Sequence, residues 1–240
     1  WKIAGINHQA WLLEISLRGV DLYPEIRRRS EAGKVPDTDR VRHEIMRRFG
    51  YYVTESSEHA AEYVPWFIKS GYPGLIERFN IPLDEYPRRC VEQIAGWQRM
   101  RDELVSNTAL RHERTGEYAS YIMEAVVTNR PCAIGGNVLN GDLVTNLPRR
   151  ACVEVPCLVD GNGVQPCAVG DLPPQCAALN MTNVNVQLLT IEAALTGRRD
   201  HIYQAALLDP HTAAELPVDR IVAMCDELIE RHGSWLPAYR

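Results

Sequence analysis

Asn7 and His8 are a pair of neighbouring residues whose types suggest ligand chemistry. They stand in the stretch Ala4–Trp11, shortly after Gly5. Glycine permits backbone conformations and close approaches that a Cβ would block, so we expect a constrained turn that presents both side chains. Two interpretations stay open for each. His8 is a metal ligand or a packed, hydrogen-bonded histidine, and Asn7 is a ligand contact or a turn residue bonded to its own backbone.

A second candidate segment covers residues 50–63. It is rich in Tyr, Ser, Thr, Glu and His, shows no clean hydrophobic period, and is flanked by aromatic and apolar residues. The composition fits the wall of a ligand site as well as it fits a solvent-facing loop. Four of its side chains are candidate general bases: the carboxylates of Glu55 and Glu58, the imidazole of His59 and the phenol of Tyr51.

Turn signals dominate the middle of the chain. Asn140-Gly141 predicts a two-residue hairpin turn, and residues 160–163, which read Asp-Gly-Asn-Gly, predict a second turn. Residues 133–169 therefore form an expected antiparallel meander. Asn140 and Asp142 either line a ligand pocket or only build the first turn.

Four separated motifs occur in one order along the chain: the Asn7-His8 stretch, Val53–Tyr63, Gly141–Pro148 and Val169–Pro174. Together they resemble glycoside hydrolase family 4, most closely its melibiase-type α-galactosidase branch. The resemblance runs from the first residue to about Trp235. Family members join an amino-terminal NAD-binding Rossmann half to a carboxyl-terminal half like that of lactate and malate dehydrogenases, and this chain resembles the second half.

The resemblance implies a domain organisation. No Gly-x-Gly-x-x-Gly phosphate loop is present in the sequence. We therefore expect residues 1–240 to be the substrate and metal domain of a longer enzyme whose Rossmann domain is absent from this chain. The isolated fragment is expected to be inactive.

The resemblance also implies a redox-assisted elimination, which the usual pair of glycosidase carboxylates does not perform. NAD⁺ takes hydride from sugar C3, a base removes the C2 proton, and the glycosidic bond breaks by elimination. Water then adds and the hydride returns. Family members hold Mn²⁺, a Lewis acid for the sugar oxygens, through one Cys and one His. His8 matches that His, whereas the Cys would lie upstream of this chain.

The resemblance places Asn7 near the sugar hydroxyls, and it places Asn140 and Asp142 in a motif that lines the sugar or nicotinamide pocket. The C2 base stays open, because the sequence departs from the family patterns between residues 51 and 63. Glu58 and His59 are favoured over Glu55 and Tyr51. The expected substrate is an α-galactoside or a related sugar.

Two alternative functions remain. The first is a 2-hydroxy-acid dehydrogenase domain of related fold, which requires an Arg that clamps a carboxylate and a His that exchanges a proton. The sequence offers no convincing pair of this kind. The second is a non-catalytic oligomerisation domain built on the long helix expected from Pro174 to Leu195. A homo-oligomer is compatible with the enzymatic function as well.

The elements that must position these residues follow from hydrophobic periodicity. Leu13, Ile15 and Leu17 alternate with polar residues and predict a half-buried strand. Helices are expected from Pro24 and over residues 37–49, 85–104, 118–126, 174–195 and 219–232. The apolar stripe of 174–195 indicates a core or subunit contact. Helices around a small antiparallel sheet give an α+β fold class.

Composition excludes several classes of protein. The net charge of −5 over 240 residues disfavours nucleic-acid binding. No apolar run is long enough to cross a membrane and no secretory signal is visible, so the cytoplasm is the expected compartment. Seven cysteines are an odd number, and free thiols are expected. Four of them fall close together in sequence but lack the C-x-x-C pairs of a structural zinc site: Cys152, Cys157, Cys167 and Cys176.

Overall fold

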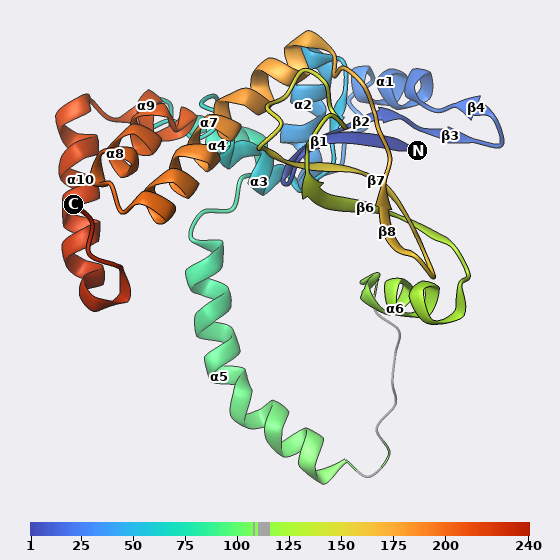
Figure 1. Ribbon diagram of the computed structural model, residues 1–240. Coiled ribbons are helices and arrows are strands. Elements are labelled where there is room, and N and C mark those ends of the chain that lie inside the picture. The colour runs from blue at the N-terminus through green and yellow to red at the C-terminus, as the bar shows by residue number, and fades with distance from the viewer. Residues whose placement is uncertain (108, 110–115) are drawn as a thin grey trace.

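An antiparallel sheet forms the centre of the computed structural model, which describes residues 1–107, 109 and 116–240 (Figure 1). Its strand order is β5-β2-β1-β7-β6, and β8 pairs with β7. The strands are β1 (Lys2–Ile6), β2 (Gln9–Glu14), β5 (Tyr52–Val53), β6 (Cys132–Leu139), β7 (Cys152–Asp160) and β8 (Gly163–Pro166). A separate ribbon pairs β3 (Ser16–Leu17) with β4 (Val20–Asp21).

Helices lie between the sheet strands along the chain and after the last of them. They are α1 (Tyr23–Glu31), α2 (Arg40–Phe49), α3 (Ser57–Glu62), α4 (Gly74–Phe79), α5 (Glu85–Ser106), α6 (Ala119–Thr128), α7 (Pro174–Thr196), α8 (Arg199–Leu208), α9 (Pro210–Glu215) and α10 (Val218–His232). Short 3-10 turns cover Asp37–Asp39 and Gly233–Trp235. The six predicted helices are confirmed, whereas α3, α4, α8 and α9 were not predicted. The α+β fold class is confirmed as well.

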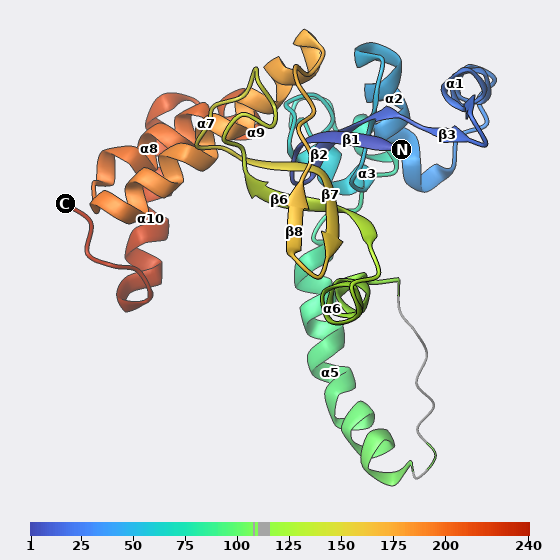
Figure 2. The same ribbon diagram turned by 45° about the vertical axis from the view of Figure 1, so that its right-hand side comes forward.

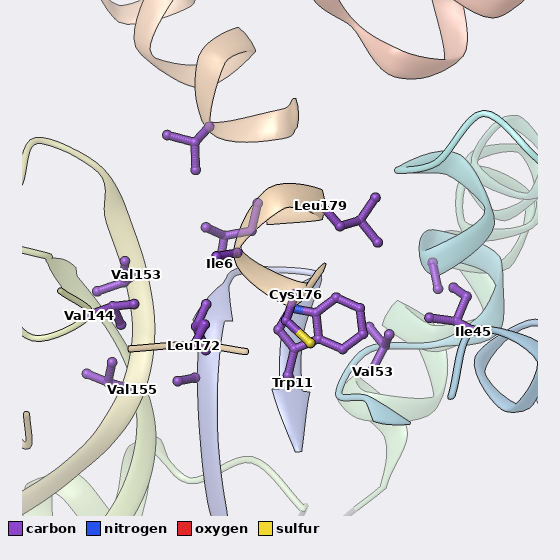
Figure 3. Close-up of a cluster of buried hydrophobic side chains, with 14 of the residues drawn as sticks. Ile6, Trp11, Ile45, Val53, Val144, Val153, Val155, Leu172, Cys176 and Leu179 are labelled. Carbon is purple, nitrogen blue, oxygen red and sulfur yellow. The ribbon is translucent and has the colours of Figure 1, made fainter. Parts of the chain in front are cut away.

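The core packs the sheet against the first half of α7 and against α2 and α3. Strand alternation points Val153 and Val155 of β7 to one face of the sheet, where they meet Leu172 and Ile6 (Figure 3). The indole of Trp11 lies beside Cys176 of α7 in the same cluster. Burial raises the pKa of the Cys176 thiol to about 12. This thiol therefore acts as a small apolar core group.

Two local predictions are wrong. The strand expected from Leu13 to Leu17 breaks after Glu14, and Leu17 lies in the exposed β3–β4 ribbon. The two-residue hairpin at Asn140-Gly141 does not form, because β6 ends before Asn140 and β7 starts only at Cys152. By contrast, the predicted turn at residues 160–163 is confirmed, with Asp160 paired to Gly163.

Helix α5 projects away from the sheet, while α8, α9 and α10 gather around the end of α7 (Figures 1 and 2). No residue of α5 is buried. Its apolar side chains therefore face outward, including Ile94 at 78% exposure and Trp97 at 58%. Within the described residues, no helix has both the length and the apolar character that a membrane crossing requires.

Candidate functional site

The Asn7-His8 pair forms the tip of the hairpin that joins β1 to β2. Ile6 pairs with Gln9, so only these two residues make the turn. His8 has a φ of 66°, in the left-handed region that few non-glycine residues adopt. Gly5, with a φ of 151°, could not carry a side chain, since a Cβ would come within 2.7 Å of the Ala10 Cα. The expected constrained turn is confirmed.

A buried polar network fixes this hairpin to α7. Asn180 accepts a hydrogen bond from the Trp11 indole at 3.1 Å and donates one to the Gln9 carbonyl oxygen at 2.7 Å. Asn183 donates to the Gln9 side-chain oxygen and to the Tyr63 carbonyl oxygen, both at 3.1 Å. Buried amides with all these partners define one arrangement of the backbone. The network therefore holds the hairpin and the end of α3 in a fixed relation.

His8 meets three side chains from the segment that follows β5. Its ring stacks on His59, with the centroids 4.7 Å apart and an interplanar angle of 4°. Its Nδ1 lies 3.3 Å from the Tyr63 hydroxyl, and its Nε2 lies 3.7 Å from a carboxylate oxygen of Glu55. The His8 side chain is 36% exposed and that of Glu55 37%. The imidazole is therefore half open to solvent and is surrounded by polar groups.

Helix α3 carries His59, while Glu55 lies just before this helix and Tyr63 just after it. Ser56 caps its first turn by accepting a hydrogen bond from the His59 backbone N–H. His59 Nδ1 lies 2.9 Å from a carboxylate oxygen of Glu62. Burial, and then the charges of Glu62 and Glu55, raise the pKa of Tyr63. Tyr63 and Glu62 are site residues that were not predicted, although residues three and four positions after His59 share its face of a helix.

The other two base candidates lie elsewhere. Glu58 faces Arg89 of α5, with 3.8 Å between a guanidinium nitrogen and a carboxylate oxygen. Tyr51 packs against the core and meets the Tyr23 ring edge to face at 6.2 Å. The structure thus gathers Glu55 and His59 around His8 and brings neither Glu58 nor Tyr51 into contact with its ring.

Asn7 has different surroundings from His8. It borders a hollow of about 410 Å³ between the start of β7 and α7. The other lining residues are Ala151, Cys152, Val186, Gln187, Leu188, Thr190 and Ile191. The amide of Asn7 is exposed at the rim of this mostly apolar space.

Asn140 and Asp142 belong to the segment between β6 and β7. The Asn140 amide is fully buried, donates to the carbonyl oxygens of Val144 and Leu147 at 2.9 Å each, and accepts from the Val144 N–H at 2.8 Å. Asp142 is exposed and pairs with Arg149. Asn140 therefore fixes the path of its own segment, and Asp142 forms a surface ion pair.

The side chains at His8 could supply some of the ligands of a metal ion, but not a complete set. A half-exposed imidazole nitrogen facing a carboxylate is a suitable start for a transition-metal site. Over residues 1–107, 109 and 116–240, however, no group of three or more His, Cys, Asp or Glu side chains could hold an ion. All seven cysteines are free, in agreement with the expectation of free thiols. Any metal held at His8 thus needs further ligands.

Comparisons with known proteins place this geometry in context. Residues 3–212 match the family model described as the family 4 glycosyl hydrolase C-terminal domain. An alpha-galactosidase of Bacillus subtilis is 59% identical over the whole chain, which covers 56% of that protein. An alpha-galactosidase of Rhizobium meliloti is 34% identical over 98% of the chain, which covers 50% of that protein. The chain thus spans about half the length of these relatives.

Solved structures share the fold at low sequence identity. The crystal structure of a putative glucosidase from Bacillus subtilis superposes with a TM-score of 0.84 at 23% identity, over 95% of this chain and 54% of the other. A 6-phospho-alpha-glucosidase from gut microorganisms, solved with NAD and Mn²⁺, gives 0.76 at 20% identity, over 100% of this chain and 57% of the other. The α+β architecture is therefore that of known glycosidase structures.

Proposed function

The chain belongs to family 4 of the glycosyl hydrolases, and from this premise we propose that it is the carboxyl-terminal, substrate- and metal-binding half of an enzyme that cleaves α-galactosides. The matched family model describes a carboxyl-terminal domain, and two relatives named alpha-galactosidase are about twice as long as the match. The proposed partner within the same protein is an upstream NAD-binding Rossmann half. The 240-residue chain alone is then inactive.

The observation that supports this proposal most strongly is the environment of His8. Its imidazole sits in a left-handed turn, half exposed, with Glu55, His59 and Tyr63 against it. Backbone strain persists when the surrounding structure enforces it, and it is concentrated at functional sites. We assign His8 as the ligand that this chain contributes to Mn²⁺. Bound Mn²⁺ would supply Lewis acidity to the sugar oxygens, and bound NAD⁺ reversible acceptance of hydride from sugar C3.

His59 is our choice for the base that removes the C2 proton. Its Nδ1 is engaged with the Glu62 carboxylate at 2.9 Å, which leaves Nε2 to accept a proton. A carboxylate on the far nitrogen fixes the tautomer and stabilises the imidazolium that forms. Glu55 is the second candidate, because its carboxylate also contacts His8. Glu58 is less suitable, since its carboxylate faces Arg89.

Sugar contacts are proposed for the residues beside the turn. Asn7 presents an exposed amide that donates and accepts hydrogen bonds, as adjacent hydroxyl groups require. For Asn140 we propose an indirect part. Its amide shapes the segment that ends at Ala151, a lining residue of the hollow next to Asn7. Asp142 has no proposed role in binding.

The proposed compartment is the cytoplasm and the proposed assembly is a homo-oligomer. Seven free thiols are consistent with a reducing compartment. The outward apolar stripe of α5 is consistent with a contact between copies, since large exposed apolar patches mark interaction sites.

Deuterium incorporation tests the proposed chemistry. The full-length enzyme, supplied with NAD⁺ and Mn²⁺, would be incubated with an aryl α-galactoside in D₂O, and the released galactose would be examined by NMR. Elimination through C2 deprotonation places solvent deuterium at C2 of the product. A conventional two-carboxylate α-galactosidase serves as the control and leaves C2 protonated.

Galactose without deuterium at C2 would contradict the elimination. NAD⁺ reduction by 2-hydroxy acids, in place of galactoside cleavage, would instead support the dehydrogenase alternative. That alternative has little support at the site. In the described part of the chain, the side chains against the His8 ring are Glu55, His59 and Tyr63, and none is the arginine that clamps a carboxylate.

A further inference from the structure

The hairpin turn at Asn7 and His8 joins two kinds of surroundings. The His8 ring meets the polar side chains of Glu55, His59 and Tyr63. Asn7 borders the hollow of about 410 Å³ between the start of β7 and α7. Because Asn7 and His8 alone make the turn, the polar cluster and the hollow adjoin the same short piece of backbone.

The wall of this hollow is mostly apolar. Ala151 and Cys152 come from the start of β7, and Val186, Leu188 and Ile191 come from α7. None of the described residues that line the hollow is charged. Ligand sites with apolar walls and few polar groups bind molecules that bury apolar surface. The hollow therefore suits an uncharged, apolar group.

Three lining residues carry a hydroxyl or an amide, and one of these groups is already bonded within α7. The Thr190 hydroxyl donates to the Val186 carbonyl oxygen at 2.8 Å. The amides of Asn7 and Gln187 remain. A hexose has a hydroxyl on most of its carbons, and each hydroxyl that leaves water needs a partner. Two amides cannot satisfy a whole sugar ring, so the hollow fits an apolar group better than it fits a sugar.

We propose that this hollow is the subsite for the aglycone, the leaving group of the galactoside, and that it takes an uncharged apolar aglycone such as a phenyl ring. This inference rests on the proposed function, which places the sugar against Asn7 and the His8 cluster. The hydroxyl-rich part of the substrate then meets polar side chains, and the apolar part meets the hollow. Ile191 is 44% exposed, and a bound ring would cover apolar surface of this kind.

Equilibrium binding of two substrate analogues tests the inference. The phenyl and methyl C-α-galactosides share the sugar, and their carbon linkage to the aglycone is not cleaved. Calorimetry on the full-length enzyme with NAD⁺ and Mn²⁺ measures both affinities. We expect the phenyl analogue to bind about ten-fold more tightly than the methyl analogue, and this preference to fall about five-fold in Ile191→Asn.

Leu195→Asn is the matched control. Leu195 is exposed, stands one turn after Ile191 on α7 and does not line the hollow. The preference of Leu195→Asn for the phenyl analogue should therefore stay within about two-fold of wild type.

Alkylation of Cys152 gives a second readout, which locates the aglycone. Cys152 and Cys167 are both exposed thiols, but only Cys152 lines the hollow. The phenyl analogue should slow the reaction of Cys152 with iodoacetamide about five-fold relative to the methyl analogue, because a covered thiol reacts slowly. The rate at Cys167 should not change. Mass spectrometry of the peptides measures both rates.

Equal affinities for the two analogues would overturn the inference. So would a preference that is unchanged in Ile191→Asn, or failure of the phenyl analogue to protect Cys152. Each of these results would leave the hollow to the upstream half or to a second sugar, and deuterium at C2 of the product would still support the proposed function. Conversely, a phenyl preference with a protected Cys152, in an enzyme that fails to cleave α-galactosides, would reject the proposed function and keep the hollow as an aryl-binding site.

Discussion

A single histidine in an unfavourable backbone conformation carries most of the functional argument. The backbone of His8 has a φ of 66°, in the left-handed region. This conformation costs a non-glycine residue roughly 1 kcal/mol of conformational free energy. The hairpin nevertheless keeps an imidazole at this position, stacked on His59 and facing Glu55. These ring contacts are the reason that we propose for a histidine at this position.

Two glutamates on α3 allow the assignment of the base to be tested at the residue scale. Glu62 orients His59, whereas Glu58 faces Arg89, so the same substitution should have different effects at the two positions. We expect His59→Ala to lower kcat by about 100-fold and Glu62→Gln by about ten-fold, because an oriented imidazole is the better base. Glu58→Gln should leave kcat within about three-fold. The measurement is steady-state kinetics of the full-length enzyme on an aryl α-galactoside. Equal losses at Glu58 and Glu62 would argue against His59.

Helix α7 determines where the site hairpin lies, because two of its asparagines enter the core. Replacing Asn180 by Ala would leave the Trp11 indole N–H and the Gln9 carbonyl oxygen without partners in a buried place. Each unpaired buried group costs about 1–3 kcal/mol, so we expect Asn180→Ala to lower the free energy of unfolding by about 3 kcal/mol. Urea denaturation measures this change.

Asn185 supplies the control on the same helix, since its side chain is exposed. Asn185→Ala should change the free energy of unfolding by less than about 0.5 kcal/mol. If Asn180→Ala were equally mild, the buried network would not be what holds the hairpin.

A second element-scale prediction concerns acid. Glu215 at the end of α9 accepts hydrogen bonds from the Ser70 N–H at 2.9 Å and the Ser70 hydroxyl at 2.6 Å, and it pairs with Lys69. These bonds lower the pKa of Glu215 from 4.5 to about 2. A carboxyl with a depressed folded-state pKa contributes stability above its unfolded-state pKa, and this contribution is lost as the pH falls.

The wild type should therefore be more stable than Glu215→Gln at neutral pH. The difference should shrink as the pH falls from about 4.5 towards 2. Unfolding by urea at a series of pH values measures it, with the exposed α10 variant Glu230→Gln as the control. A difference that does not change with pH would show that the hydrogen bonds to Ser70 do not depend on the Glu215 charge.

The hairpin predictions show where local sequence signals fail. Residues 160–163 form the expected turn because both flanking strands continue up to it. Asn140-Gly141 has an equally good local signal, but the Asn140 amide binds backbone groups of Val144 and Leu147 further along the chain. A turn preference depends on the identity of a few neighbouring residues. It does not predict hydrogen bonds to residues further along the chain.

The cluster around His8 could be predicted only in part for a related reason. The sequence identified His8, His59 and Glu55 as chemically able residues, and the fold brings them together. Tyr63 gave no comparable signal, because its contact with His8 depends on the packing of residues that are far apart in sequence.

At the scale of the whole molecule, α5 is the element that the fold leaves uncovered. Periodicity predicted its apolar stripe, but periodicity cannot tell what covers a stripe, and within the described residues nothing buries it. Val91, Ile94, Trp97, Met100 and Leu104 are all exposed. We expect this stripe to join copies of the protein.

Light scattering after size exclusion tests this association. Ile94→Glu should shift the full-length protein towards monomer, because a charge in an apolar contact is costly. Arg99→Gln, which changes the net charge by the same amount away from the stripe, should leave the mass unchanged. An Ile94→Glu protein with the wild-type mass would place the contact elsewhere.

His8 is the Mn²⁺ ligand that we propose for this half of the enzyme. The most direct measurement is Mn²⁺ affinity of the full-length protein, determined by electron paramagnetic resonance of the free ion, for wild type, His8→Ala and His201→Ala. His201 is a histidine of α8 that bonds to Gln204. We predict that His8→Ala weakens Mn²⁺ binding by about 100-fold and that His201→Ala leaves it unchanged. Normal Mn²⁺ affinity in a folded His8→Ala protein would contradict the account.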